Sequence, residues 1–203
     1  RMERLEEYYN RGVRLLGLTW NYTNCFGHPN STDPVKMKRG LSDFGKEAIG
    51  ELNRLGILID VSHLSDGGFW DVAKLSKKPF VASHSNARAL CDHPRNLTDE
   101  MIRTLGEKGG IAGVNHCPKF LYPGSSENRI EDLVRHLTHI RKVGGRECAA
   151  LGSDFDGISG KLEIPGPQEY EKLELALSKA GFSGAEIEEV FYKNAERVIR
   201  DVL

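Results

Sequence analysis

Two histidines each follow a short apolar run, and they are the residues best placed in this sequence to do chemistry. His63 ends the stretch Ile-Leu-Ile-Asp-Val-Ser-His, and His84 ends Pro-Phe-Val-Ala-Ser-His. Each run is typical of a buried strand in a parallel sheet. Residues 66–77 between them predict a helix, and a strand, a helix and a strand in series bring both carboxyl ends to one edge of a sheet. We therefore expect the two imidazoles side by side, where α/β barrels keep their catalytic groups, and a metal site is the first hypothesis.

A third candidate ligand follows another predicted strand, at residues 149–153. Asp154 comes directly after that strand, in the stretch Leu-Gly-Ser-Asp-Phe-Asp-Gly. Two imidazoles and a carboxylate from one sheet edge suit zinc or a similar ion. The alternative is that each histidine is only a hydrogen-bonded residue at a strand end. Because three neighbouring strand ends each carry a possible ligand, the metal-site interpretation is favoured. Asp156 either binds substrate or makes a turn with Gly157, and the turn is favoured.

Four other residues have a chemical and a structural interpretation. Arg88 and Arg95 follow the second strand–histidine pair, and either could hold a substrate carboxylate through two parallel hydrogen bonds or simply face solvent. His116, after a predicted strand at residues 111–115, is either a further ligand or part of the pocket wall. Trp20 lies just past the first predicted strand, where it could wall the pocket or only pack.

The remaining histidines and the cysteines are expected to be structural. His136 and His139 flank the apolar face of a predicted helix, so we expect them at the surface, and His28 and His93 lie in predicted loops and should be solvated. The cysteines are too few and too widely spaced for a disulfide framework, which predicts free, partly buried thiols at all four positions: Cys25, Cys91, Cys117 and Cys148.

The elements that must position these residues alternate along the chain between strand and helix. The predicted strands are the apolar runs at residues 13–19, 57–61, 80–83, 111–115 and 149–153. The predicted helices lie between and after them, with Ser42 and Thr98 as N-caps and a break in the C-terminal tail near residues 181–184. This alternation predicts a parallel sheet covered by helices, either an open doubly wound sheet or the later part of an eight-stranded barrel.

Length and composition bound the class of protein. The 203 residues suit a single domain over 1–203, and the net charge of −1 argues against a nucleic-acid or anionic-membrane partner. No apolar run approaches the roughly 20 residues of a membrane helix, and the charged start at residues 1–12 is unlike a signal peptide. We therefore expect a cytoplasmic protein without a membrane segment. Neither GxxxxGKS nor GxGxxG occurs, which weakens nucleotide-binding interpretations.

Several motifs together resemble those of the membrane (renal) dipeptidase family. They are Gly-Ile-Leu-Ile-Asp-Val-Ser-His at 56–63, Ser-His-Ser-Asn at 83–86, Arg-Asn at 95–96 and Gly-Ser-Asp-Phe-Asp-Gly at 152–157, with two upstream matches at 12–21 and 40–45. The resemblance covers essentially the whole chain in the right order. It implies an α/β (β/α)8 TIM-barrel metal-dependent hydrolase, present here as a partial barrel of about five parallel strands. It also implies a dipeptidase with two zinc ions, which often accepts a D residue at the C-terminal position of its dipeptide substrate.

The same resemblance implies roles for individual residues. His63 and His84 would bind the second zinc ion. Asp154 would lie at the first zinc ion, where it would orient or deprotonate the bridging water and act as the catalytic proton-transfer group. Arg95 would hold the terminal carboxylate of the dipeptide. The other residues on the substrate side would be Asn96, Trp20 and Asp156; Trp20 stands where some members carry a histidine.

The sequence also departs from the family pattern. That pattern has an early His-x-Asp on the first strand and a glutamate that bridges both metals, and no His-x-Asp occurs in this sequence. The expectation is that about three strands of the eight precede residue 1, and that this chain binds one metal ion or none. Open sheet edges predict a homo-oligomer, most simply a dimer. Two alternatives stay open: another amidohydrolase-like metal hydrolase, and a non-catalytic remnant.

Overall fold

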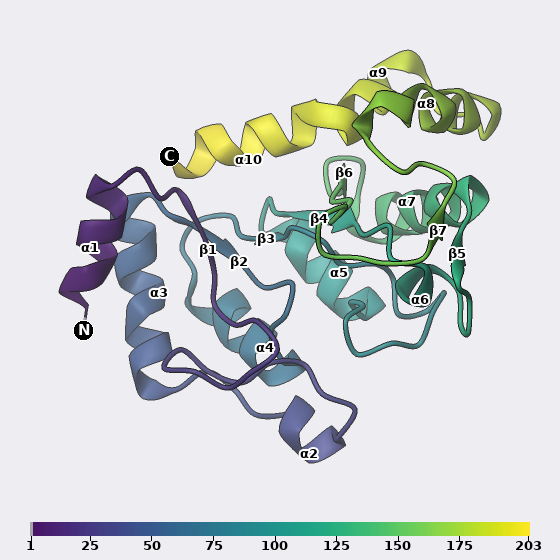
Figure 1. Cartoon of the computed structure of the whole chain (residues 1–203). Helices are drawn as coiled ribbons and strands as arrows, with labels where there is room; N and C mark the ends of the chain where they lie inside the picture. The colour runs from purple at the N-terminus through teal and green to yellow at the C-terminus, as the bar shows by residue number, and fades with distance from the viewer. Residues whose placement is uncertain (1) are drawn as a thin grey trace.

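Five parallel strands, paired in chain order, carry the predicted site residues. The computed structural model describes residues 2–203. Its main sheet contains β1 (Leu15–Gly17), β2 (Leu58–Asp60), β3 (Val81–Ala82), β4 (Ile111–Val114) and β6 (Ala149–Leu151), each parallel to the next (Figure 1). All five predicted strands are confirmed, although each is shorter than its apolar run. A second, two-stranded sheet pairs β5 (Glu127–Asn128) with β7 (Lys161–Leu162).

The larger helices pack on one face of the main sheet. They are α3 (Asp43–Leu55), α4 (Asp66–Leu75), α5 (Asp99–Glu107) and α7 (Ile130–Gly144), and their buried apolar residues form one core cluster with alternate residues of the strands. The predicted caps are confirmed: the Ser42 hydroxyl accepts a hydrogen bond from Gly45 N, and the Thr98 hydroxyl accepts one from Met101 N. Each cap satisfies a backbone donor that the first helical turn leaves free.

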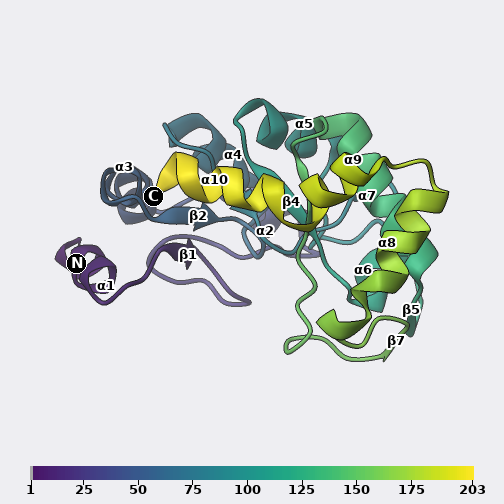
Figure 2. The same cartoon turned by 90° about the horizontal axis from the view of Figure 1, so that it is seen from above.

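The opposite face is covered at the amino ends of the strands by α10 (Asn194–Val202). Figures 1 and 2 show this C-terminal helix crossing the strands. The second apolar cluster joins two valines of α10 to the first residues of three strands and one residue of β6; it contains Leu58, Val81, Ile111, Ala150, Val198 and Val202. Because side chains alternate along a strand, this face is distinct from the one that α3, α4, α5 and α7 cover.

The C-terminal tail is helical and broken where the sequence predicts. After the short 3₁₀ helix η1 (Pro167–Glu169), α8 (Tyr170–Lys179) ends before Gly181 (φ 91°), and α9 (Gly184–Glu188) then leads through the π-helical turn η2 (Glu189–Lys193) into α10. The other short helices are α1 (Glu3–Asn10), α2 (Pro34–Met37) and α6 (Pro118–Leu121).

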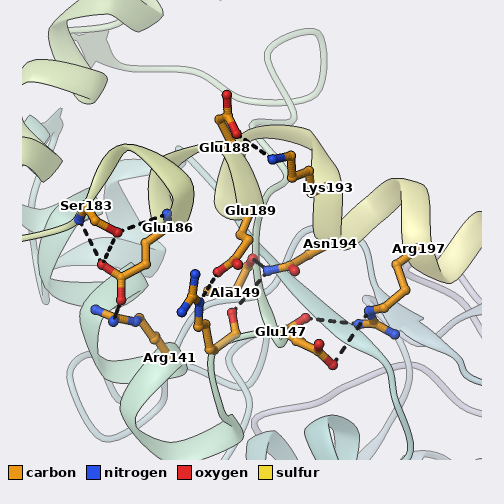
Figure 3. A network of polar contacts seen from close by, with 11 residues as sticks. Arg141, Glu147, Ala149, Ser183, Glu186, Glu188, Glu189, Lys193, Asn194 and Arg197 are labelled. Atoms are coloured by element: carbon orange, nitrogen blue, oxygen red, sulfur yellow. Dashed lines mark hydrogen bonds and ion pairs between the residues drawn. The ribbon is translucent and has the colours of Figure 1, made fainter.

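A polar network anchors this tail to the sheet (Figure 3). The Asn194 side-chain amide donates to the carbonyls of Arg146 (3.1 Å) and Ala149 (2.9 Å), at the start of β6. Arg197 donates to the carbonyls of Gly109 (2.7 Å) and Glu147 (3.1 Å). The helix is therefore held to the strand beginnings by side chains that satisfy backbone carbonyls.

One predicted surface residue lies in the core instead. His136 is fully buried; its Nδ1 accepts a hydrogen bond from Ala87 N (3.1 Å), and its Nε2 donates to the carbonyl of Leu121 (2.9 Å). Burial lowers the pKa of His136 to about 4, so the ring stays neutral. The prediction was wrong because backbone partners from distant loops, which helical periodicity does not show, satisfy both ring nitrogens.

The four thiols are free, as predicted, although Cys25 is exposed. Within residues 2–203, no helix combines the length and the hydropathy that crossing a membrane requires.

Candidate functional site

The two histidines meet just beyond the carboxyl ends of β2 and β3. His63 Nε2 lies 3.0 Å from His84 Nε2, and the ring centroids are 5.0 Å apart. His63 Nδ1 contacts the side-chain oxygen of Asn21 at 3.1 Å, so Nδ1 carries the proton and Nε2 is left with a free lone pair. The juxtaposition that the strand–helix–strand order predicts is therefore confirmed.

Both imidazoles are held in their neutral form. Burial and the nearby Arg95 guanidinium lower the pKa of His63 to about 3. The same two causes lower the pKa of His84. A neutral imidazole is the form that ligates a metal ion.

Asp154 adopts a left-handed backbone conformation, which residues other than glycine seldom take and which aspartate tolerates better than most. Its φ is 62°, the one positive value at a non-glycine position among the described residues. Asn115 Nδ2 donates to Asp154 Oδ2 (3.0 Å), and a Cβ at Gly157 would lie 2.5 Å from Asp154 Oδ1. Such conformations persist where the surroundings enforce them, often in active sites.

The carboxyl end of the sheet is hollowed on both sides of Asp154. A cavity of about 470 Å³ is lined by Asp154, His63, Arg95 and Trp20, among others. A second, of about 480 Å³, is lined by Asp154 and His84 together with Ser83, Tyr170 and Phe191. A larger surface groove of about 620 Å³ between α7 and α8 contains none of the predicted site residues.

The structure distinguishes the two arginines that the sequence left equivalent. Arg88 makes a two-pronged pair with Asp66, both contacts at 2.8 Å, and its Nε donates to the carbonyl of Asn96 (2.8 Å). Arg95 is only 7% exposed and has weaker partners, Ser85 Oγ at 3.4 Å and the carbonyl of His84 at 3.2 Å. No carboxylate of the described chain forms an ion pair with Arg95.

The Arg95 guanidinium is nevertheless charged at neutral pH. Burial lowers the pKa of Arg95 to about 10, which still leaves it protonated. Asp60 and Asp154 stabilise this charge electrostatically without forming an ion pair with it, and a buried charge without a direct partner is costly. A cation in this position is therefore suited to an anion that enters the cavity.

The other predicted substrate-side residues lie in different settings. Asn96 is buried, and its amide donates to the carbonyls of Cys91 (2.8 Å) and Phe120 (2.9 Å), so it holds the loop that carries Arg95. Trp20 is 62% exposed at the cavity mouth. Asp156 is exposed and lines neither cavity, in line with its interpretation as a turn residue.

His116 is buried behind the site. Its ring packs edge-on against Phe155 and Tyr170, with centroids 5.1 Å and 5.8 Å away. Neither ring nitrogen has a hydrogen-bond partner within the part of the chain that the structure describes. Burial lowers the pKa of His116 to about 4.

The sequence analysis missed Asp60, which lies in β2 and is 7% exposed. It accepts hydrogen bonds from the hydroxyls of Ser62 (2.7 Å) and Ser83 (2.6 Å), beside both histidines. The signal was present, because a carboxylate within an apolar strand needs a compensating polar network.

The residues fit two ligands of a metal ion. The two Nε2 atoms point at each other at a distance that lets one ion bind both. Over residues 2–203, however, no three histidine, cysteine, aspartate or glutamate side chains gather into a group that could hold an ion. Asp154 shares a cavity with each histidine but does not complete such a group.

This arrangement places a candidate metal site with two histidines at the carboxyl end of a parallel α/β sheet, where α/β barrels carry their active sites. The sequence model of the membrane dipeptidase (Peptidase family M19) family matches residues 1–203, and the chain belongs to that family. The family resemblance stated from the motifs is confirmed.

Individual relatives agree with this assignment. The chain is 36% identical over 98% of its length to an uncharacterized protein in the pqqA 5′ region of Klebsiella pneumoniae, covering 75% of that protein. It is 42% identical over 76% of its length to an uncharacterized dipeptidase of Schizosaccharomyces pombe, of which it covers 38%. A solved metallopeptidase from Rhodobacter sphaeroides, liganded with a phosphinate mimic of the dipeptide L-Ala-D-Ala, is 31% identical with a TM-score of 0.91; the match covers 99% of this chain and 59% of that one.

The chain thus spans well under two thirds of the yeast dipeptidase and of the solved metallopeptidase. Its five strands and their helices match part of the TIM barrel of this family, which confirms the predicted fold class.

Proposed function

We propose that this chain supplies the metal-binding histidines, the proton-transfer carboxylate and the substrate-carboxylate clamp of a zinc-dependent dipeptidase. The observation that carries the proposal is Arg95, a buried cation without an ion-pair partner in the described chain, on the same cavity as His63 and Asp154. A free C-terminal carboxylate is the group of a dipeptide that would neutralise it, through paired hydrogen bonds.

His63 and His84 are the residues that would hold zinc, as their neutral rings and converging Nε2 atoms support. Zinc when bound lowers the pKa of water to about 7 and polarises a carbonyl. Asp154 would take a proton from the attacking water and return it to the leaving amine. Its oxygen is held by Asn115 at 3.0 Å, which orients the carboxylate for this transfer.

The substrate would lie in the cavity of about 470 Å³ with its carboxylate at Arg95 and its amino-terminal part toward Trp20. Asn96 would act indirectly by holding the Arg95 loop. A dipeptide with a C-terminal D residue is the preferred candidate, because the Rhodobacter sphaeroides relative was solved with a mimic of L-Ala-D-Ala. A homodimer and a cytoplasmic location remain predictions, and sedimentation and cell fractionation would test them.

The test compares L-Ala-D-Ala with its C-terminal amide, using the full chain and added zinc. The carboxylate form should be hydrolysed, and the amide should lose most of its kcat/KM because Arg95 has no anion to bind. Arg95→Lys should raise KM for the dipeptide by about 10–100-fold, the equivalent of one charged hydrogen bond. The control is Arg103→Lys, an exposed change on α5. Equal hydrolysis of both substrates would reject the proposal in favour of a different amide hydrolase.

A further inference from the structure

Asp60 is surrounded entirely by donors. Its Oδ1 accepts from Ser62 N (3.1 Å), Ser62 Oγ (2.7 Å) and Ser83 N (2.9 Å), and its Oδ2 accepts from Ser83 Oγ (2.6 Å). The two backbone N–H groups can only donate. The two serine hydroxyls also lie 3.1 Å from each other, but each is closer to Asp60. A carboxylate can only accept, so we assign the single proton of each hydroxyl to the shorter bond, to Asp60.

This use of the serine protons determines the state of the neighbouring imidazole. Ser83 Oγ lies 2.6 Å from Asp60 Oδ2 and also 2.6 Å from His84 Nδ1. Because the Ser83 proton is already given to Asp60, Ser83 Oγ must accept from His84, and Nδ1 of His84 therefore carries a proton. Ser62 Oγ accepts from His84 N (3.0 Å) in the same way, which holds the backbone of that residue.

A neutral imidazole has one ring proton. With that proton on Nδ1, the Nε2 of His84 presents a bare lone pair toward His63 Nε2, 3.0 Å away. This is the tautomer that a metal ligand needs at Nε2. Since the His63 proton is also on Nδ1, the contact between the two Nε2 atoms is not a hydrogen bond; it is the spacing of two lone pairs that can share one ion.

We propose that Asp60 is a positioning residue that acts through Ser83 to lock His84 in the Nδ1–H tautomer, so that Nε2 is available to a metal ion. The inference rests on the proposed function only in taking zinc as the ion. Asp60 touches neither histidine side chain directly, and its effect passes through the hydroxyl of Ser83.

The substitution Asp60→Asn separates this role from a purely structural one. Three of the four donors converge on Oδ1, so the amide oxygen should take that position and the NH₂ group should take the place of Oδ2. The NH₂ group would then donate to Ser83 Oγ, and the freed hydroxyl proton would turn to His84 Nδ1. The size of the side chain is retained, but the hydrogen-bond direction reverses, as does the tautomer of His84.

The primary measurement is the ¹⁵N spectrum of histidine-labelled, metal-free chain at neutral pH, with His84→Asn used to identify the His84 signals. In the unmodified chain, Nδ1 should show the protonated-nitrogen shift and Nε2 the lone-pair shift. Asp60→Asn should exchange the two, and Ser83→Ala should give a mixture. Zinc affinity, measured by competition with a chelating dye, should fall about 10–100-fold in Asp60→Asn.

The matched control is Ser76→Ala. It also removes a buried serine hydroxyl, one that donates to the carbonyl of Lys78 (2.7 Å), but it lies at the end of α4 away from the histidines. It should lower the unfolding temperature without changing either the His84 signals or zinc affinity.

An Nε2–H tautomer in the unmodified chain would overturn the proposal, and that measurement needs no variant to fold. The proposal would also be overturned if the Asp60→Asn chain lost stability but kept the original His84 tautomer and the original zinc affinity. That result is expected if Asp60 has a structural role alone. If the tautomer reverses as expected but the zinc-loaded, unmodified chain does not hydrolyse dipeptides, the positioning role stands and the proposed function fails.

Discussion

One face of the sheet has opposite characters at its two ends. At the amino ends, Leu58, Val81 and Ile111 are buried under α10 in an apolar cluster. Nearer the carboxyl ends, the same face carries Asp60, two residues after Leu58, and Ser83, two residues after Val81. Asp60 is hydrogen-bonded to Ser83, and Ser83 is hydrogen-bonded to His84 of the histidine pair. Apolar packing thus serves one end of the sheet, and a polar network serves the other.

The two ends also differ in how completely their polar groups are paired. At the amino end, the Asn194 amide has two backbone partners and Arg197 has two, although the buried Nε of Arg197 has no hydrogen-bond partner among the described residues. At the carboxyl end, Arg95 has no ion-pair partner among the described residues, and Asp154 holds a left-handed backbone. The comparison shows that apolar packing stabilises one end of the strands, while the candidate site lies at the other end, as is usual for barrel enzymes.

The largest effect expected from a single substitution at the carboxyl end is that of Asp154→Asn. Asparagine tolerates the left-handed backbone and keeps an oxygen for Asn115, but it cannot take a proton. We expect kcat for L-Ala-D-Ala to fall about 10²–10⁴-fold, with the unfolding free energy changed by less than about 0.5 kcal/mol. Steady-state kinetics with zinc, together with urea unfolding, measures both quantities.

The matched control removes a carboxylate elsewhere. Glu174→Gln, an exposed change on α8, should leave both kcat and stability as they are. A kcat in Asp154→Asn equal to that of the control would show that proton transfer uses another group.

At the amino end, Ile111→Ala should give the reverse pattern. The side chain is 8% exposed and packs in the cluster under α10, so its truncation should cost about 2–5 kcal/mol of unfolding free energy. KM for the dipeptide should stay within about twofold, because surface and core changes away from a site leave substrate contacts intact. A large change in KM would mean that the two ends of the sheet are coupled.

A smaller loss of stability is expected from Asn194→Ala, which leaves the carbonyls of Arg146 and Ala149 without their donor. The expected cost is about 1–3 kcal/mol. The neighbouring Lys193→Ala removes an exposed ion pair with Glu188 (Figure 3) and should cost clearly less than Asn194→Ala, because water screens an exposed pair. Urea unfolding of both variants compares them, and equal costs would show that the amide bonds do not stabilise the tail.

Local patterns predict the framework of this molecule but not the pairing of its polar groups. The five strands and the caps Ser42 and Thr98 follow from apolar runs and capping chemistry. The convergence of His63 and His84 follows from the parallel connection between their strands. These features depend on neighbours in sequence or on one topological rule.

The remaining features depend on contacts between distant segments. Arg88 is distinguished from Arg95 chiefly by its ion pair with Asp66, which lies 22 residues before Arg88. His136 is buried because the backbone at Ala87 and at the end of α6, at Leu121, meets its ring. Motif resemblance proposed the role of Arg95, but only the three-dimensional structure shows that it is buried without a direct ion-pair partner among the described residues.

The effect that is smallest at neutral pH concerns His116, a buried residue at the carboxyl end of the sheet whose ring nitrogens have no partners in the described chain. Burial lowers the pKa of His116 to about 4, so the unfolded ring, with a pKa of about 6.5, takes up a proton before the folded one does. This contribution to stability is therefore complete above about pH 6.5 and is lost as the pH falls toward 4.

His116→Leu replaces the imidazole with an apolar side chain of similar volume and so removes the proton uptake. The variant should be as stable as the original chain or more stable at pH 7, because no ring nitrogen is left buried and unpaired. Below pH 6.5, the slope of unfolding free energy against pH should be shallower by up to about 1.4 kcal/mol per pH unit. His136 still titrates in the variant, so some acid sensitivity must remain. If the slope for His116→Leu equals that of the original chain, the His116 ring must be in contact with water in the folded state. The polar region at the carboxyl end of the sheet would then reach behind Phe155 and Tyr170.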